Sequence, residues 1–158
     1  MIYHKKEDIS KYSLDQIQAL RRKMGIIFQD YKVIDHMTAK ENIIYPLILY
    51  GIGENIIDSK YRKLKQKYNL TSFENTPVKF LSSGEKQKVA ISRALIHEPE
   101  FLIADEPTGN LDWEHTEAIA DLLIQTNQSG NTVFLITHDI HLVNYLKEKH
   151  PIRLEILN

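Results

Sequence analysis

Asp105 and Glu106 stand side by side at the end of an apolar run, in the stretch FLIADEPTGNLD. In an open parallel sheet, ligands bind beyond the carboxyl ends of the strands, so a strand ending here would present both carboxylates to a ligand. One acidic side chain at such an edge can hold Mg²⁺ through water, while its neighbour orients an attacking water. The alternative is an acidic junction between a strand and a loop that binds nothing.

Three further polar residues stand where the same edge would receive them. Asp112 follows in the turn GNLD, His138 comes directly after the apolar run TVFLIT, and Gln29 ends the run IIFQ. The histidine is a candidate for contacting a terminal phosphate. The glutamine is a candidate for placing an amide oxygen near the metal and the water. A lone histidine is more often structural, and this chain has seven.

The segment LSSGEKQK, which begins at Leu81, has the features of a helix start. Ser82 and Glu85 have the S-x-x-E spacing of a capping box. Backbone N–H groups at a helix N-terminus form an anion site, to which Ser82, Ser83 and Gly84 would present hydroxyls and backbone. The alternative is an ordinary capping box that starts a helix and binds no ligand, which would account for the same residues.

The strands and helices that would position these residues follow from the pattern of apolar side chains. Continuous apolar runs at 101–105 and 132–137 are typical of parallel strands buried on both faces, and 26–29 is a shorter one. A helix is expected at 115–130 and an alternating strand at 152–157. This order implies an α/β fold with a largely parallel sheet.

Helical patterns fill the remaining sequence. We expect a first helix over 13–24, stopped by Gly25, and a second that starts at Thr38 with Glu41 as its capping partner. Two more are expected at 58–70 and 82–98. The block 38–97 would form a helical subdomain inserted into a core made of residues 1–37 and 98–158.

Composition excludes several classes of function. The net charge of −1 over 158 residues gives no global attraction to nucleic acid, and the basic stretch 59–68 is typical of a solvated helix face. The chain has no cysteine, so disulfides and cysteine-based metal sites are excluded. The longest apolar stretch, 43–52, is far shorter than the ~20 residues of a membrane span.

Taken in chain order, these motifs closely resemble the ATP-binding subunits of ABC transporters, which have a P-loop NTPase-like fold. The resemblance assigns the signature to 81–85, the Walker B strand to 101–105 and the D-loop to 109–112. It also implies roles for single residues: catalysis by Glu106, His138 and Gln29; metal binding by Asp105 and Gln29; and cofactor binding by Ser82, Ser83, Gly84, Glu85 and Asp112.

The same resemblance implies cofactors and partners. ATP and Mg²⁺ would be bound, in a dimer with a second copy or with an intact ATPase subunit, at the cytoplasmic face of the plasma membrane. The wordings ADEPTGNLD, RRKMGIIFQDYKV and THDIHLVNYL are most similar to cell-division ATPases of the FtsE type, which implies an integral membrane partner of the FtsX type. Lipoprotein-release and macrolide-efflux ATPases are the next most similar. We expect the membrane subunit to dock at Asp30, Tyr31 and 38–50.

The sequence departs from the family pattern in two places. Ser83 stands where the signature usually has a second glycine, and its Cβ restricts close approach to a phosphate. A phosphate-cradling loop needs G-x-x-x-x-G-K-[ST], and none of the six glycines is followed by lysine. We therefore expect the sequence to correspond to the distal two-thirds of an ABC ATPase, truncated at its N-terminus, with a missing strand that would pair beside 132–137.

Two other interpretations share these motifs. The chain could be a degenerate subunit that donates its signature to an intact partner. A DNA-repair ATPase of the SMC type has the same signature and Walker B, but a long coiled coil would then separate Gln29 from Leu81. Here only residues 30–80 lie between them, which disfavours that interpretation.

Overall fold

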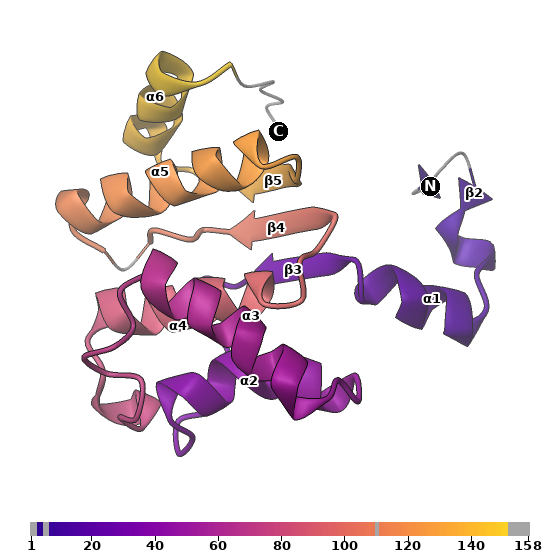
Figure 1. The fold of residues 1–158 in the computed structure, drawn as a ribbon. Helices are drawn as coiled ribbons and strands as arrows, with labels where there is room; N and C mark the ends of the chain where they lie inside the picture. Colours follow the sequence, from indigo (N-terminus) through magenta and orange to yellow (C-terminus); the bar gives the residue numbers. More distant parts are fainter. Residues whose placement is uncertain (1–2, 5–6, 110, 152–158) are drawn as a thin grey trace.

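The protein is described by a computed structural model that covers residues 3–4, 7–109 and 111–151. Its central sheet has three parallel strands in the order β3-β4-β5, formed by Met24–Ile27, Phe101–Asp105 and Thr132–Ile136. The arrowheads of β3 and β4 point to the same side, where the residues that follow each strand gather (Figure 1). The α/β class with a parallel sheet is confirmed.

Helices account for most of the other described residues. They are α1 (Leu14–Arg21), α2 (Ala39–Leu49), α3 (Glu54–Lys67), α4 (Ser83–Leu95), α5 (Trp113–Gln128) and α6 (Ile140–Lys149). A short antiparallel pair, β1 (Tyr3–His4) and β2 (Glu7–Asp8), precedes them. The predicted capping boxes at Thr38 and Ser82 both form. The strand predicted at 152–157 lies outside the described residues.

Gly25 lies inside β3, where a helix stop was predicted. The first helix ends at Arg21 and the strand begins at Met24, two residues earlier than the predicted range 26–29. A Cβ atom on Gly25 would collide with the backbone oxygen of Ala94 in α4. Glycine therefore lets α4 approach the sheet closely, a tertiary requirement that local sequence patterns do not reveal.

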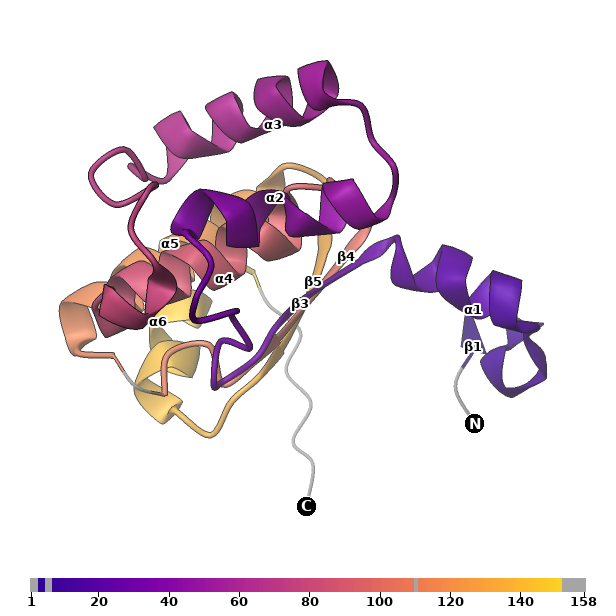
Figure 2. The same ribbon diagram turned by 90° about the horizontal axis from the view of Figure 1, so that it is seen from below.

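Helices cover one face of the sheet, and the prediction that its strands are buried on both faces is wrong for the described residues. Figure 2 shows α4 and α5 on one side of the three strands. Gly25, Ile27, Leu102 and Ala104 alternate toward that side and are buried. On the other face, side chains such as Phe134 remain about half exposed, because none of the described elements packs over them.

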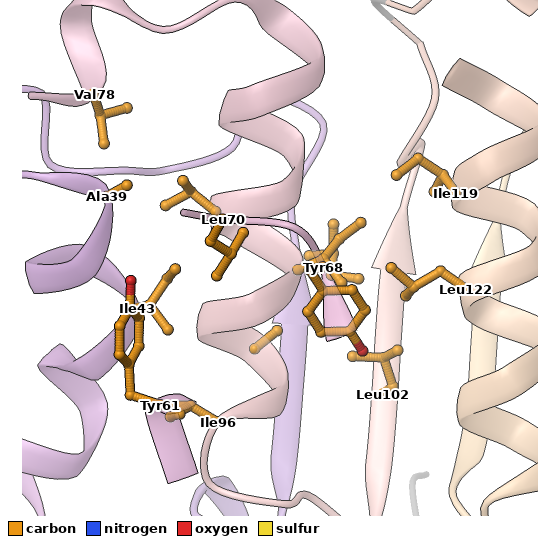
Figure 3. Close-up of a cluster of buried hydrophobic side chains, with 14 of the residues drawn as sticks. Ala39, Ile43, Tyr61, Tyr68, Leu70, Val78, Ile96, Leu102, Ile119 and Leu122 are labelled. Carbon is orange, nitrogen blue, oxygen red and sulfur yellow. The ribbon is translucent and has the colours of Figure 1, made fainter. Parts of the chain in front are cut away.

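The main hydrophobic cluster joins the helices of 38–97 to the sheet. Ile43 of α2 and Ile96, which follows α4, are buried in the same cluster as Leu102 of β4 and Leu122 of α5 (Figure 3). The division into a core and an inserted subdomain stays a prediction. No helix among the described residues is long and apolar enough to cross a membrane.

Candidate functional site at the carboxyl ends of the strands

Glu106 and His138 face each other directly beyond the ends of β4 and β5. The Glu106 Oε1 atom accepts hydrogen bonds from the His138 backbone N–H at 2.8 Å and from its Nδ1 at 2.7 Å. Its Oε2 atom accepts from the Thr137 hydroxyl at 2.9 Å. Because an ionised carboxylate only accepts, the histidine proton lies on Nδ1, and Nε2 is left toward solvent in the neutral ring. The His138 side chain is 86% exposed, so Nε2 is accessible to a ligand.

The backbone at Glu106 is held in an unusual conformation. Its φ is 44°, in the left-handed region that side chains other than glycine adopt at a cost. Its N–H donates to the Ile136 carbonyl at 2.9 Å, which ties the turn to the end of β5. The turn that follows β4 therefore aims the carboxylate at the neighbouring strand end.

Gln29 follows β3 and reaches the same region. Its Nε2 lies 3.5 Å from the position that a Cβ on Gly109 would occupy, and the Glu106 carbonyl oxygen lies 3.6 Å from it. The amide of Gln29 therefore lies beside the turn that carries Glu106. The structure brings three of the predicted residues, Gln29, Glu106 and His138, to one edge of the sheet.

Asp105 is exposed at the last position of β4, as a metal ligand at this edge requires. No cluster of three or more His, Asp or Glu residues that could hold a metal occurs within the described part of the chain. Mg²⁺ is usually held by one or two carboxylates together with substrate phosphates and waters, so a single exposed aspartate fits it. The donor set suits Mg²⁺ bound with a nucleotide better than Mg²⁺ bound by the protein alone.

The predicted signature residues form the start of α4. The Glu85 carboxylate accepts from the Ser82 backbone N–H and hydroxyl, each at 2.9 Å, and the Glu85 N–H donates to the Ser82 hydroxyl at 3.3 Å. Both side chains are thus engaged with each other. Ser83 is exposed and Gly84 is buried, so the outward hydroxyl at this helix start belongs to Ser83.

Asp112 caps α5 and joins the D-loop to the signature through His115. Its Oδ1 accepts from the His115 N–H at 3.0 Å and contacts the ring Nδ1 at 2.7 Å, and these hydrogen bonds lower the pKa of Asp112. The His115 ring lies against Gly84, with Cδ2 2.7 Å from the position that a Cβ there would occupy. The glycine of the signature is therefore needed to accommodate this imidazole.

A pocket of about 430 Å³ opens beside the Glu106–His138 pair. Its other walls include Trp113, at the start of α5, and His141, at the start of α6. The two rings meet edge to face, with centroids 6.3 Å apart. The pocket therefore lies between the D-loop and the residues after His138.

Three residues of this region were not predicted from the sequence: Thr137, His115 and Trp113. Thr137 is adjacent to His138, but no sequence pattern indicates that its hydroxyl bonds to Glu106. His115 follows Asp112 at the i+3 spacing typical of an N-cap partner, and this was the one available signal. The aromatic contact of Trp113 with α6 depends on tertiary packing alone.

Residues 1–109 match the family described as ABC transporter. The chain belongs to the ABC transporter family. It is 40% identical over 144 residues to a methionine import ATP-binding protein, MetN 1, of Listeria monocytogenes. That match covers 90% of this chain and 43% of the relative. It is 38% identical over 148 residues to the cell division ATP-binding protein FtsE of Streptococcus pneumoniae, and this match covers 90% of the present chain and 62% of FtsE.

Solved structures agree with this ABC transporter assignment. A dimeric ATP-binding cassette in a post-hydrolysis state, bound to ADP and Pi, matches with a TM-score of 0.77 at 31% identity, over 90% of this chain and 64% of that one. The cbiO1 protein of Clostridium perfringens, part of the ABC transporter complex cbiONQ, matches with a TM-score of 0.79 at 29% identity, over 90% and 58%. This ABC chain spans less than two thirds of the length of each of these relatives.

Proposed function

We propose that the chain is the ATP-binding subunit of an FtsE-type ABC complex, which couples ATP binding and hydrolysis to an integral membrane partner of the FtsX type in cell division. The observation that carries the ATPase part is the hydrogen-bonded Glu106–His138 pair at the ends of β4 and β5. Similarity to FtsE supports the cell-division part. The subunit would lie at the cytoplasmic face of the membrane, held there by its partner.

The side chains divide the chemistry between them. Glu106 orients the attacking water and accepts its proton, after shifting part of its carboxylate away from His138. With Nδ1–H directed at Glu106, His138 donates from Nε2 to the terminal phosphate only when its ring is doubly protonated, since phosphate oxygens are acceptors. Gln29 places its amide next to the water. Asp105 would hold Mg²⁺, which neutralises charge on the phosphoryl oxygens when it is bound.

The start of α4 contributes to a second nucleotide across a dimer. In family dimers, each nucleotide lies between the phosphate loop of one subunit and the signature of the other. Here Ser83, the Gly84 backbone and the α4 helix dipole would face the partner's nucleotide, with Asp112 beside them. Ser82 and Glu85 fix the helix start through their capping box.

Fragment complementation tests the ATPase proposal. The 158-residue chain alone should show no Mg²⁺-dependent ATP turnover above a Glu106→Gln control, because the phosphate-loop sequence is not among its residues. Turnover should emerge when the phosphate-loop segment of an FtsE-type ATPase is added as a separate polypeptide. Glu106→Gln should lower that turnover roughly 10²- to 10⁴-fold.

The matched control is Glu98→Gln, which removes an exposed carboxylate paired with Lys60. Glu98 lies before the start of β4, whereas the site follows its end, so the substitution should leave turnover unchanged. Turnover by the chain alone, or a bound mixture that is inactive, would contradict the proposal. An in-frame G-x-x-x-x-G-K-[ST] in the upstream genomic DNA would show that the same gene supplies the loop.

A second candidate is the ATP-binding subunit of a methionine importer, which the 40% identity to MetN 1 favours. Co-purification with an FtsX-type membrane partner or with the permease of a methionine importer separates the two candidates. A third candidate is a degenerate subunit that only donates its signature to an intact ATPase. In that case, the chain would restore activity to an ATPase with a disabled signature even when it carries Glu106→Gln.

A further inference from the structure

The loop after Gln29 contains two successive residues in a costly backbone conformation. Tyr31 has a φ of 62° and Lys32 a φ of 48°, and no other adjacent pair of non-glycine residues within the described ranges has positive φ. Left-handed backbone places Cβ close to the following carbonyl oxygen, so each residue raises the free energy of the loop. Such a conformation persists only where surrounding contacts fix it.

The guanidinium of Arg93, in α4, supplies those contacts to the loop. Its Nη1 donates to the Lys32 carbonyl at 2.7 Å and its Nη2 donates to the Tyr31 carbonyl at 2.8 Å. The planar guanidinium can satisfy two neighbouring acceptors at once, which a lysine ammonium does less well. Burial lowers the pKa of Arg93 from a value so high that the group stays charged.

Gln87, on the same helix, makes a comparable contact with the loop after Glu106. It is 1% exposed, and its Nε2 donates to the Pro107 carbonyl at 2.6 Å. Its Oε1 is buried without a hydrogen-bond partner in the described residues. An unpaired buried acceptor lowers stability, so a methionine of similar size would pack here at less cost. What the glutamine adds is the bond to Pro107.

We propose that Arg93 and Gln87 are positioning residues, through which α4 holds the loop that carries Gln29 and the loop that carries Glu106. The start of α4 carries Ser83 and Gly84, so a shift of the helix at the signature reaches both loops through these two side chains. The loop contacts themselves need no nucleotide. Their consequence for hydrolysis rests on the proposed function.

Amide hydrogen exchange in the nucleotide-free chain tests the proposal. The Tyr31 and Lys32 amides bond to carbonyls within their own loop, whereas the Ile34 amide bonds to Asn42 of α2 at 2.8 Å and serves as an internal control. Arg93→Met should speed exchange at 31 and 32 by about 10- to 100-fold, the equilibrium worth of hydrogen bonds to a charged group, and leave Ile34 unchanged. Gln87→Met should instead speed exchange at the Gly109 and Leu111 amides, which lie in the loop that Gln87 contacts.

Two further variants complete the experiment. Lys88→Met removes a charge from the same helix, from a side chain that forms no hydrogen bond or ion pair with the described residues, and should change neither set of amides. Arg93→Lys keeps the charge but not the planar fork, so it should give an intermediate rate at 31 and 32, and it replaces Arg93→Met if that variant does not fold.

Unchanged exchange at 31 and 32 in both Arg93 variants overturns the proposal. So does faster exchange spread equally over Ile34 and α4, since that is general destabilisation. These outcomes do not depend on ATP, so a failure of the proposed ATPase function is recognised separately, in the complementation assay.

Discussion

The two faces of the central sheet differ in what covers them. On the face toward α4 and α5, Gly25 and Ala104 are small and Ile27 and Leu102 are fully buried. On the opposite face, Phe134 and Ile136 are 54% and 53% exposed. Both faces carry apolar side chains, but only one of them has a helical layer among the described residues.

The covered face is packed by helices of the chain itself, whereas the open face has no packing partner among the described residues. The covered face has the small residues that close helix packing requires. The open face has large side chains, with Phe134 stacked on Phe101 at a centroid distance of 6.5 Å. A contiguous apolar surface of this kind marks an interaction site or an aggregation hazard. The two faces should therefore respond very differently to substitution.

Gly25→Ala should have the largest effect, because it adds an atom where the sheet and α4 are closest. The new methyl group would collide with the Ala94 carbonyl, and both Leu102 and Pro99 lie 3.1 Å from its position. Overpacking typically costs about 1–3 kcal/mol of unfolding free energy, and a collision with backbone places this variant at the upper end of that range or above it. Urea denaturation of the purified variant measures this loss.

Gly53→Ala is the matched control. No atom lies within 4 Å of its added methyl group, and its φ of −67° suits alanine. Gly53 is the N-cap of α3, where alanine is less favoured than glycine, so the effect should be about 1 kcal/mol or less. Equal stability of the Gly25 and Gly53 variants would mean that α4 does not pack closely on the sheet, and the contrast between the faces would weaken.

Local sequence signals predicted the fold where local physics decides it. The capping boxes at Thr38 and Ser82, and the strand at 101–105, required only spacing and apolar runs. Gly25 was misplaced, because its requirement comes from Ala94, 69 residues away in the chain. The open face was missed because a continuous apolar run does not reveal whether one or both faces are covered.

In the candidate site too, features set by the local sequence were predicted and features set by tertiary contacts were not. Strand ends predicted that Gln29, Glu106 and His138 would lie near one another, because parallel strands place their carboxyl ends on one edge. The contacts of Arg93 could not be predicted, since they depend on backbone carbonyls in a loop whose conformation the residue letters do not specify. Backbone acceptors are available at every residue, so sequence carries no signal for such a bond.

His97 offers a smaller, pH-dependent test on the covered face. Its ring contacts the Met24 carbonyl at 3.2 Å, and burial lowers its pKa below the ordinary value of about 6.5. The folded protein then binds fewer protons than the unfolded chain, so stability is complete above pH 6.5 and falls as the pH drops below it. Stability should therefore decline between pH 6.5 and pH 5.

His97→Gln should flatten this dependence between pH 6.5 and 5, since the amide keeps a donor for the Met24 carbonyl and does not titrate. His36→Gln is the control, because His36 is exposed. Chemical denaturation at several pH values measures both. A slope that His97→Gln leaves unchanged would show that this part of the packed layer admits water.

Among the substitutions within the sheet, Phe134→Ala should have the smallest effect on stability, which sharpens the contrast between the faces. Leu102→Ala, on the covered face of the neighbouring strand, should cost roughly 2–5 kcal/mol, the usual range for a buried leucine. Phe134 is more than half exposed, so its truncation should cost less than about 1 kcal/mol. Self-association, measured by sedimentation velocity, should decrease in Phe134→Ala, because an exposed apolar face on β5, which lies at an edge of the sheet formed by the described strands, promotes contacts between copies. If Phe134→Ala were instead as destabilising as Leu102→Ala, the open face would be covered in solution, and the search for what covers it would begin at β5.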